Sequence, residues 1–91
     1  MDSPAPENLS RAIDLWRDAY RHQMAGDLDR AIALYQESIR ICPTAEAHTF
    51  LGWTYSFQGR LDEATRECHL AIEIDPDFGN PYNDIGVYLM Q

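Results

Sequence analysis

Apolar side chains recur along most of this chain at spacings of three and four residues, which places them on one face of an α-helix. The clearest run consists of Leu28, Ala31, Ile32, Leu34, Tyr35 and Ile39. Comparable runs predict further helices over residues 9–25, 45–58 and 62–74, with a fifth beginning near Asn80 and Pro81. The alternation of apolar and polar positions that is typical of strands is nearly absent. The pattern therefore predicts an all-α chain of five helices.

Residues suited to helix ends stand between these runs. Asp27 and Thr44 precede the second and third helices, where their side-chain oxygens can accept backbone N–H bonds as caps. Gly26 and Gly59 each follow a helix, at the point where a left-handed residue lets the chain reverse. Because the loops are short, we expect helices that are neighbours in sequence to pack antiparallel.

The chain also repeats itself. Residues 26–31, Gly-Asp-Leu-Asp-Arg-Ala, return thirty-three positions later as Gly-Arg-Leu-Asp-Glu-Ala at 59–64. The same shift relates Pro43 to Pro76. A fixed period of this length predicts stacked helical units rather than one closed globule.

The repeating unit resembles the tetratricopeptide repeat, a helix-turn-helix motif of 34 residues. In residues 45–78 the signature positions are occupied by Leu51, Gly52, Tyr55, Gly59, Ala64, Ala71 and Pro76. Residues 12–44 match mainly in their second half, at Gly26, Ala31, Tyr35, Ser38 and Pro43, whereas Asp18 and His22 depart from the pattern. Residues 79–91 form half a unit. The resemblance implies a right-handed superhelical stack of antiparallel helix pairs, an α-α solenoid.

We expect one domain over residues 9–91, preceded by a disordered tail over residues 1–8. Asn8 or Ser10 is the expected cap of the first helix. The acidic, proline-containing start of the chain is neither a signal nor a transit peptide, and no apolar run is long enough to span a membrane. The expected location is the cytoplasm.

Charge narrows the classes of partner. The net charge is −8, and all seven basic residues are arginines. An acidic chain is poorly suited to nucleic acid, which needs a basic face. Chemistry that depends on a lysine is excluded. The acidic excess favours apolar or basic protein partners.

No metal, cofactor or catalytic site is expected. The histidines and cysteines do not show the spacings that direct two ligands to one side of a helix. Cys42 and Cys68 are expected to be buried or half-buried thiols, since two cysteines make no disulfide framework. The carboxylates at helix starts are explained by the helix dipole, and no nucleophile motif is present. The chain is therefore not expected to be an enzyme.

A binding groove is the better hypothesis for function. In stacked repeats the first helix of each unit lines a concave surface. By analogy with the family, the peptide-binding residues are Trp16, Tyr20, Gln23, Thr49, Trp53, Ser56, Asn80 and Asn83. Trp16 and Tyr20 share a helix face, and Trp and Tyr are enriched at binding hot spots. The alternative is that both tryptophans pack between helices. The carboxylate clamp of chaperone-binding members is not expected, because it needs lysine.

The last helix has no partner hairpin. Its apolar residues predict an oligomer interface made of Tyr82, Ile85, Val87, Tyr88 and Leu89. The chain is then either part of a longer array, or it self-associates through this helix as a homodimer or a domain-swapped assembly, which is the alternative function.

Overall fold

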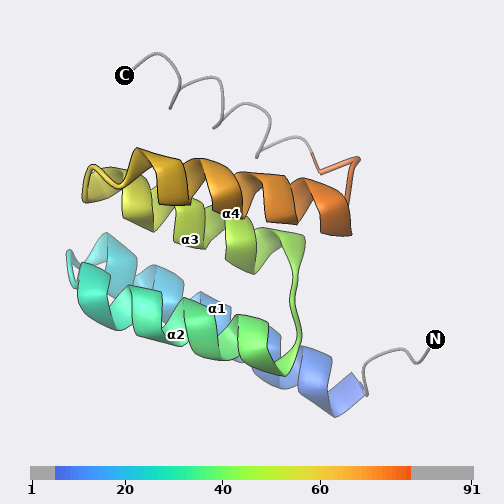
Figure 1. Ribbon diagram of the computed structural model, residues 1–91. Coiled ribbons are helices and arrows are strands. Elements are labelled where there is room, and N and C mark those ends of the chain that lie inside the picture. The colour runs from blue at the N-terminus through green and yellow to red at the C-terminus, as the bar shows by residue number, and fades with distance from the viewer. Residues whose placement is uncertain (1–5, 79–91) are drawn as a thin grey trace.

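A computed structural model describes residues 6–78 and shows two helical hairpins in this part of the chain. The helices are α1 (Pro6–Met24), α2 (Leu28–Ile41), α3 (Ala45–Phe57) and α4 (Leu61–Ile74), and no strand occurs among these residues (Figure 1). The predicted all-helical class is therefore confirmed over the two repeats. The predicted fifth helix and half repeat lie outside the described residues.

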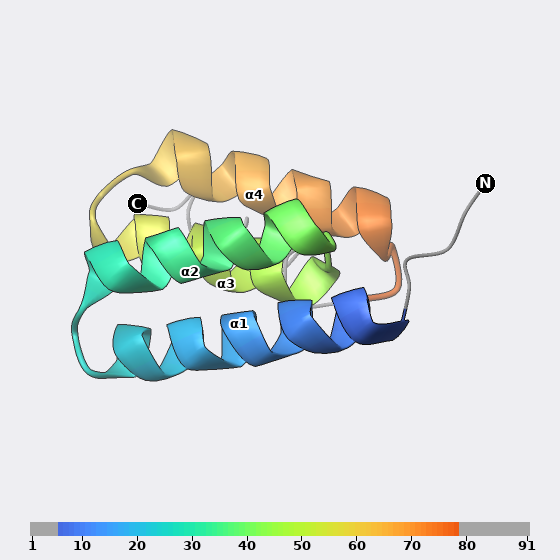
Figure 2. The same cartoon turned by 90° about the horizontal axis from the view of Figure 1, so that it is seen from below.

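The hairpins stack as two layers. The layer of α1 and α2 lies against the layer of α3 and α4, with α2 and α3 forming most of the contact and α1 reaching α3 along its inner side (Figure 1). The four helix axes lie roughly along one direction when the molecule is seen from below, and both hairpin turns lie at one end of the stack (Figure 2). This arrangement makes α1 and α3 neighbours although α2 separates them in sequence.

The predicted turns and caps are confirmed. The Asp27 side chain accepts from the Arg30 N–H at 3.2 Å, and the Thr44 hydroxyl accepts from the Ala47 N–H at 3.2 Å. Gly26 and Gly59 have φ of +88° and +75°, the left-handed region that suits glycine. These local signals fix where each hairpin reverses.

The first helix begins earlier than predicted. It starts at Pro6 rather than near Leu9, so residues 6–8 are helical and do not belong to a tail. Asn8 and Ser10 therefore lie inside the helix and do not cap it. Proline is well suited to a first helical position because its missing N–H has no partner there in any case. Glu7 in the first turn complements the helix dipole.

Small residues let the helices of the second hairpin approach closely. A Cβ on Gly52 of α3 would lie 2.8 Å from the Ala64 carbonyl oxygen and 3.3 Å from the Glu67 Cβ. Ala64 and Cys68 of α4 are completely buried at this crossing. The two cysteines, Cys42 and Cys68, are buried thiols as expected. The crossing explains why the repeat has small residues at these positions.

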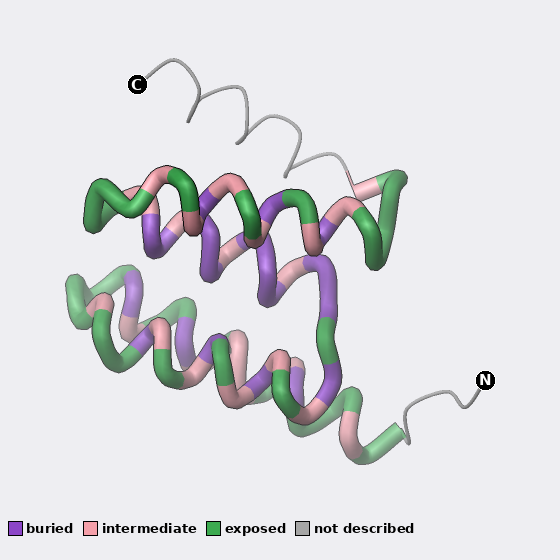
Figure 3. Tube along the Cα trace, in the orientation of Figure 1, coloured by how far each residue is buried: buried purple, intermediate pink, exposed green. Residues whose placement is uncertain are grey.

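Buried residues occur on all four helices, within each hairpin as well as between the two hairpins (Figure 3). The core cluster consists of Ala19, Ala31, Tyr35, Leu51, Tyr55, Ala64 and Cys68. Polar bonds also link the two helices of each hairpin. The Ser38 hydroxyl of α2 donates to the Ala12 carbonyl of α1 at 2.6 Å, and His48 Nδ1 of α3 lies 2.8 Å from Glu67 Oε1 of α4. Each hairpin is thus held by alanine packing together with a buried polar link.

A further polar group joins three helices. The Tyr35 hydroxyl of α2 donates to Gln23 Oε1 of α1 at 2.6 Å, and the Thr54 hydroxyl of α3 approaches the same oxygen at 2.8 Å. All three residues are buried. Burial raises the pKa of Tyr35 far above its ordinary value, so its phenol keeps the proton that it donates. We call Gln23, Tyr35 and Thr54 the polar triad.

Substitution of Gly52 tests the close helix crossing, because the crossing determines whether the substitution raises or lowers the free energy of unfolding. In an unconstrained helix, Gly→Ala stabilises by about 1 kcal/mol. At Gly52 the added methyl would collide with the backbone of α4, so we expect Gly52→Ala to lower the free energy of unfolding by about 1–3 kcal/mol. Urea denaturation followed by circular dichroism measures this change. A stabilised variant would show that the helices can separate at no cost.

Overpacking the facing side of the same crossing should have a similar effect. Ala64→Leu adds three carbons at a completely buried position and should lower the free energy of unfolding by about 1–3 kcal/mol. The matched control is Ala33→Leu, the same change at an exposed position of α2, which should stay within about 0.5 kcal/mol of the unmodified chain. Equal thermal melts for the two variants would contradict this description of the core.

Candidate peptide-binding surface

Aromatic side chains gather where α1 and α3 meet, and we call this the inner side of the two helices. Phe50 of α3 lies at its centre, with ring centroids 5.5 Å from Trp16 and 5.4 Å from Tyr20 of α1, and 6.4 Å from Tyr35 of α2. We call these four residues the aromatic junction. Tilted rings at such distances attract one another beyond the burial of their area. The junction therefore sets the spacing between the first helices of the two repeats.

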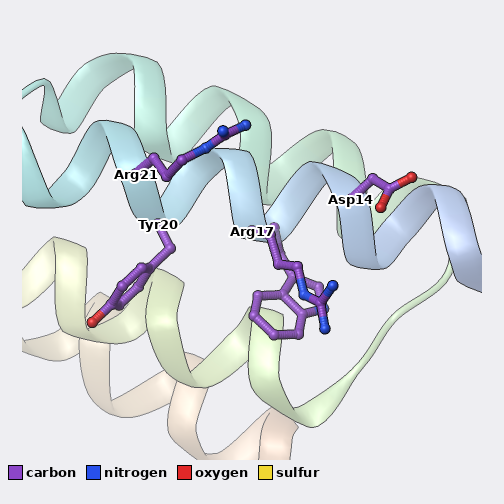
Figure 4. A pocket seen from close by; sticks show the side chains of 5 residues that line it. Asp14, Arg17, Tyr20 and Arg21 are labelled. Carbon is purple, nitrogen blue, oxygen red and sulfur yellow. The ribbon is translucent and has the colours of Figure 1, made fainter.

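A pocket of about 490 Å³ opens beside the junction. Its described lining comes from α1 and consists of Asp14, Trp16, Arg17, Tyr20 and Arg21. Tyr20 and Arg17 extend from α1 toward α3, whereas Asp14 and Arg21 extend away from it (Figure 4). Tyr20 is 37% exposed although its ring touches Phe50. An open aromatic edge beside a pocket of this volume is a typical feature of binding sites.

The two arginines at this pocket differ in whether an acidic side chain pairs with them. Arg21 is paired with Asp18 at 2.8 Å. Arg17 is in no ion pair with a residue of the described part, and its guanidinium carbon lies 5.9 Å from the centre of the Trp16 ring. Arg17 is exposed. The pocket thus combines an apolar wall with one available cation.

A second aromatic group lies farther along α3. Trp53 is half-buried, and its ring centroid is 5.2 Å from that of Phe57. Phe57 is 55% exposed, and Met24, its counterpart at the end of α1, is 52% exposed. Trp53 and Phe57 are one turn apart, as are Tyr20 and Met24. Exposed apolar residues therefore continue from the pocket toward the hairpin turns.

Two of the predicted contact residues are buried instead. Gln23 is 4% exposed and belongs to the polar triad, so its side chain is committed to holding the helices together. Thr49 is 2% exposed. The sequence did not indicate this burial, because the repeat pattern places a residue on a helix but does not say how far the neighbouring helix covers it. Gln23 and Thr49 are packing residues in this structure.

The other predicted contact residues divide into two groups. Trp16, Tyr20, Trp53 and Ser56 lie on α1 and α3 and are partly or largely accessible. The Ser56 hydroxyl donates to the Trp53 carbonyl at 2.6 Å. Asn80 and Asn83, together with the predicted interface residues Tyr82, Ile85, Val87, Tyr88 and Leu89, lie outside the residues that the structure describes.

The prediction from sequence missed Phe50 and Arg17. Phe50 is one of the apolar residues that predict its helix, but its contact with both Trp16 and Tyr20 depends on how α3 is rotated toward α1. Arg17 directly follows Trp16, a predicted contact residue, and this neighbourhood could have indicated it from the sequence. Trp53 follows Tyr20 by thirty-three positions, which is the period of the repeat, but its ring contacts Phe57 rather than joining the aromatic junction.

Three buried polar atoms lack a hydrogen-bond partner within residues 6–78. They are Trp16 Nε1, Gln23 Nε2 and Thr49 Oγ1. All three belong to α1 and α3, the helices that carry the pocket and the exposed aromatics. Leaving such a group unpaired costs roughly 1–3 kcal/mol, and native proteins leave few.

Metal and membrane sites are not seen in the described part of the chain. Over residues 6–78 no three His, Cys, Asp or Glu side chains come close enough to hold a metal ion. Within the same residues no helix combines the length and the apolar character needed to cross a membrane.

Comparison with known proteins supports the repeat. A sequence model of the tetratricopeptide repeat matches residues 45–78. The small glutamine-rich tetratricopeptide repeat-containing protein 2 of Mycosarcoma maydis is 29% identical over 84 residues, which are 91% of this chain and 24% of that protein. The chain thus spans about a quarter of the length of this curated relative.

The fold also has a solved counterpart. The second tetratricopeptide repeat domain of Spaghetti (RPAP3), bound to the HSP90 peptide SRMEEVD, matches with a TM-score of 0.87 and 21% sequence identity, over 92% of this chain and 79% of that one. At this identity the likeness shows the fold alone. The tetratricopeptide repeat model thus covers residues 45–78, and the chain is similar in sequence and in fold to proteins that contain this repeat.

Proposed function

We propose that this chain is a non-catalytic interaction module that binds a segment of a partner protein on the inner side of α1 and α3. The observation that carries the proposal is the pocket beside the aromatic junction, where Tyr20 is 37% exposed and Trp16 forms part of the wall. Aromatic residues that stay accessible while their rings are held by neighbours lose little side-chain entropy on binding. They are therefore effective anchors for a partner.

The extent of the surface fits a peptide. The pocket volume of about 490 Å³ suits one or two apolar side chains rather than a whole domain. Met24 and Phe57 extend the apolar surface past the pocket, along the same two helices. An extended or helical segment lying across both helices would cover the pocket with one side chain and the exposed ends with others. The cytoplasmic location stays a prediction from the sequence.

The solved relative supports the class of partner but not its identity. That domain holds a short HSP90 peptide, so this fold can accommodate a peptide. The present chain has no lysine, and Trp16 and Tyr20 stand on the first helix where the family's clamp needs basic or amide groups. The mode of binding proposed for this chain therefore uses aromatic contacts rather than a lysine clamp for a terminal carboxylate.

Selection from a random twelve-residue peptide display library tests this proposal even though the natural partner is not identified. The Tyr20→Ala chain should bind the peptides selected on the unmodified chain about tenfold more weakly, because the substitution removes an anchor from the pocket. The matched control is Ile74→Ala, which removes an exposed apolar side chain of α4, away from the pocket. Fluorescence anisotropy with labelled peptides measures the affinity.

Two results would contradict the proposal. One is a selection on the unmodified chain that enriches no peptide. The other is equal affinity of the Tyr20→Ala and Ile74→Ala chains, provided that circular dichroism shows both to be folded. In the second case the selected peptides bind elsewhere on the molecule.

Self-association through residues 82–89 is the second function predicted from the sequence, and these residues lie outside the described part. Its test is the mass in solution. Light scattering at low micromolar concentration should give a dimer if this alternative holds, and a monomer would contradict it. Trp53→Ala should leave that mass unchanged if the inner surface of α3 serves a partner protein rather than a second copy.

A further inference from the structure

The charge of the pocket helix differs from the charge of the chain. The whole chain has a net charge of −8, but α1 carries three arginines and three acidic residues and is neutral. The acidic excess is concentrated on residues 61–78, where a single arginine, Arg66, accompanies Asp62, Glu63, Glu67, Glu73, Asp75 and Asp77. Because exposed charges are screened beyond about 10 Å, a partner at the pocket responds mainly to the nearby groups.

Arg17 is the charged side chain of the described pocket lining that extends toward α3 and so can contact a partner there. Its side chain extends toward α3 beside Tyr20, whereas Asp14 and Arg21 extend away (Figure 4). Arg21, the other arginine of the pocket lining, pairs with Asp18, and elsewhere Arg40 pairs with Glu37 and Arg60 with Glu63. Arg17 has no such partner in residues 6–78.

The position of Arg17 over Trp16 leaves its hydrogen-bond donors available. A guanidinium that lies over an aromatic ring uses its flat face, while its N–H groups point outward around the edge. These donors match the two oxygens of a carboxylate. The ring contact also reduces the freedom that Arg17 would lose on binding. The same cation would repel a lysine or arginine brought to the pocket.

From these contacts we infer that the partner segment presents an aspartate or glutamate directly beside a bulky apolar residue. The apolar side chain enters the pocket against Trp16 and Tyr20, and the carboxylate pairs with Arg17. The inference rests on the proposed function and names the chemistry of its partner. It replaces the expectation of an apolar or basic partner that follows from net charge, because the charged side chain beside Trp16, unpaired within residues 6–78, is a cation, Arg17.

Glu46 is the acidic group that would favour the other outcome. It is half-buried in the first turn of α3, where it could attract a basic segment. The two groups predict opposite compositions for a bound peptide. A selection experiment can therefore decide between Arg17 and Glu46 as the group that sets the charge preference.

The test is selection from the random twelve-residue display library on three folded chains: unmodified, Arg17→Glu and Arg66→Glu. The last is the matched control, since it makes the same charge change at an exposed arginine of α4. The unmodified and control chains should enrich Asp or Glu next to Leu, Ile, Phe or Met. The Arg17→Glu chain should lose this preference and enrich Lys or Arg at that place.

Measuring how tightly one selected peptide binds to the unmodified and Arg17→Glu chains tests whether its acidic residue contacts Arg17. Replacing its acidic residue with the amide should weaken binding about tenfold on the unmodified chain, as expected for a charge-assisted hydrogen bond. The same replacement should have little effect on Arg17→Glu, because the partner of the carboxylate is already gone. This non-additivity assigns the contact to one pair of residues.

The outcomes separate this inference from the proposed function. Acidic enrichment that persists on Arg17→Glu, or basic enrichment on the unmodified chain that is lost with Glu46→Gln, overturns the inference while Tyr20→Ala still weakens binding. Peptides that bind equally well to Tyr20→Ala count against the proposed function itself, and a selection that enriches nothing overturns both.

Discussion

The contact between the two hairpins is the constraint on which the rest of this structure depends, and Tyr35 is at its centre. This residue of α2 is completely buried, donates to Gln23 of α1 and packs its ring toward Phe50 of α3. A buried phenol without an acceptor would be costly, so the hydroxyl holds Gln23 in place. Tyr35 therefore links α1 and α3 from the helix that lies between them in sequence.

The candidate binding surface depends on how α1 and α3 lie against each other. Once α1 and α3 are held side by side, Trp16 and Tyr20 reach the same ring, Phe50, and an open pocket is left along α1. Small residues at the α3–α4 crossing keep the second hairpin thin enough to stack in this way. Core packing and the candidate site therefore share residues, and the site requires both repeats to be folded.

The net charge of the whole chain does not predict the charge at the pocket. The acidic residues that produce the net charge are gathered on α4 and the turn after it, while the pocket helix is neutral and presents Arg17 over Trp16. Ion pairs such as Arg21–Asp18 further reduce the number of charged side chains that can pair with a partner. Exposed pairs of this kind add little stability, but the pairing of Arg21 leaves Arg17 as the unpaired arginine of the described pocket lining.

The sequence by itself determined the helices, the two turns at Gly26 and Gly59 and the small residues at the helix crossing. These features depend on the spacing and type of residues along one segment, which is local information. Only the tertiary structure decided that Gln23 and Thr49 are buried, that Phe50 joins the aromatics of α1, and that Arg17 is the available charge. The physical reason is that a helical pattern places a side chain on one face, while its exposure and partners depend on the rotation and approach of the neighbouring helix.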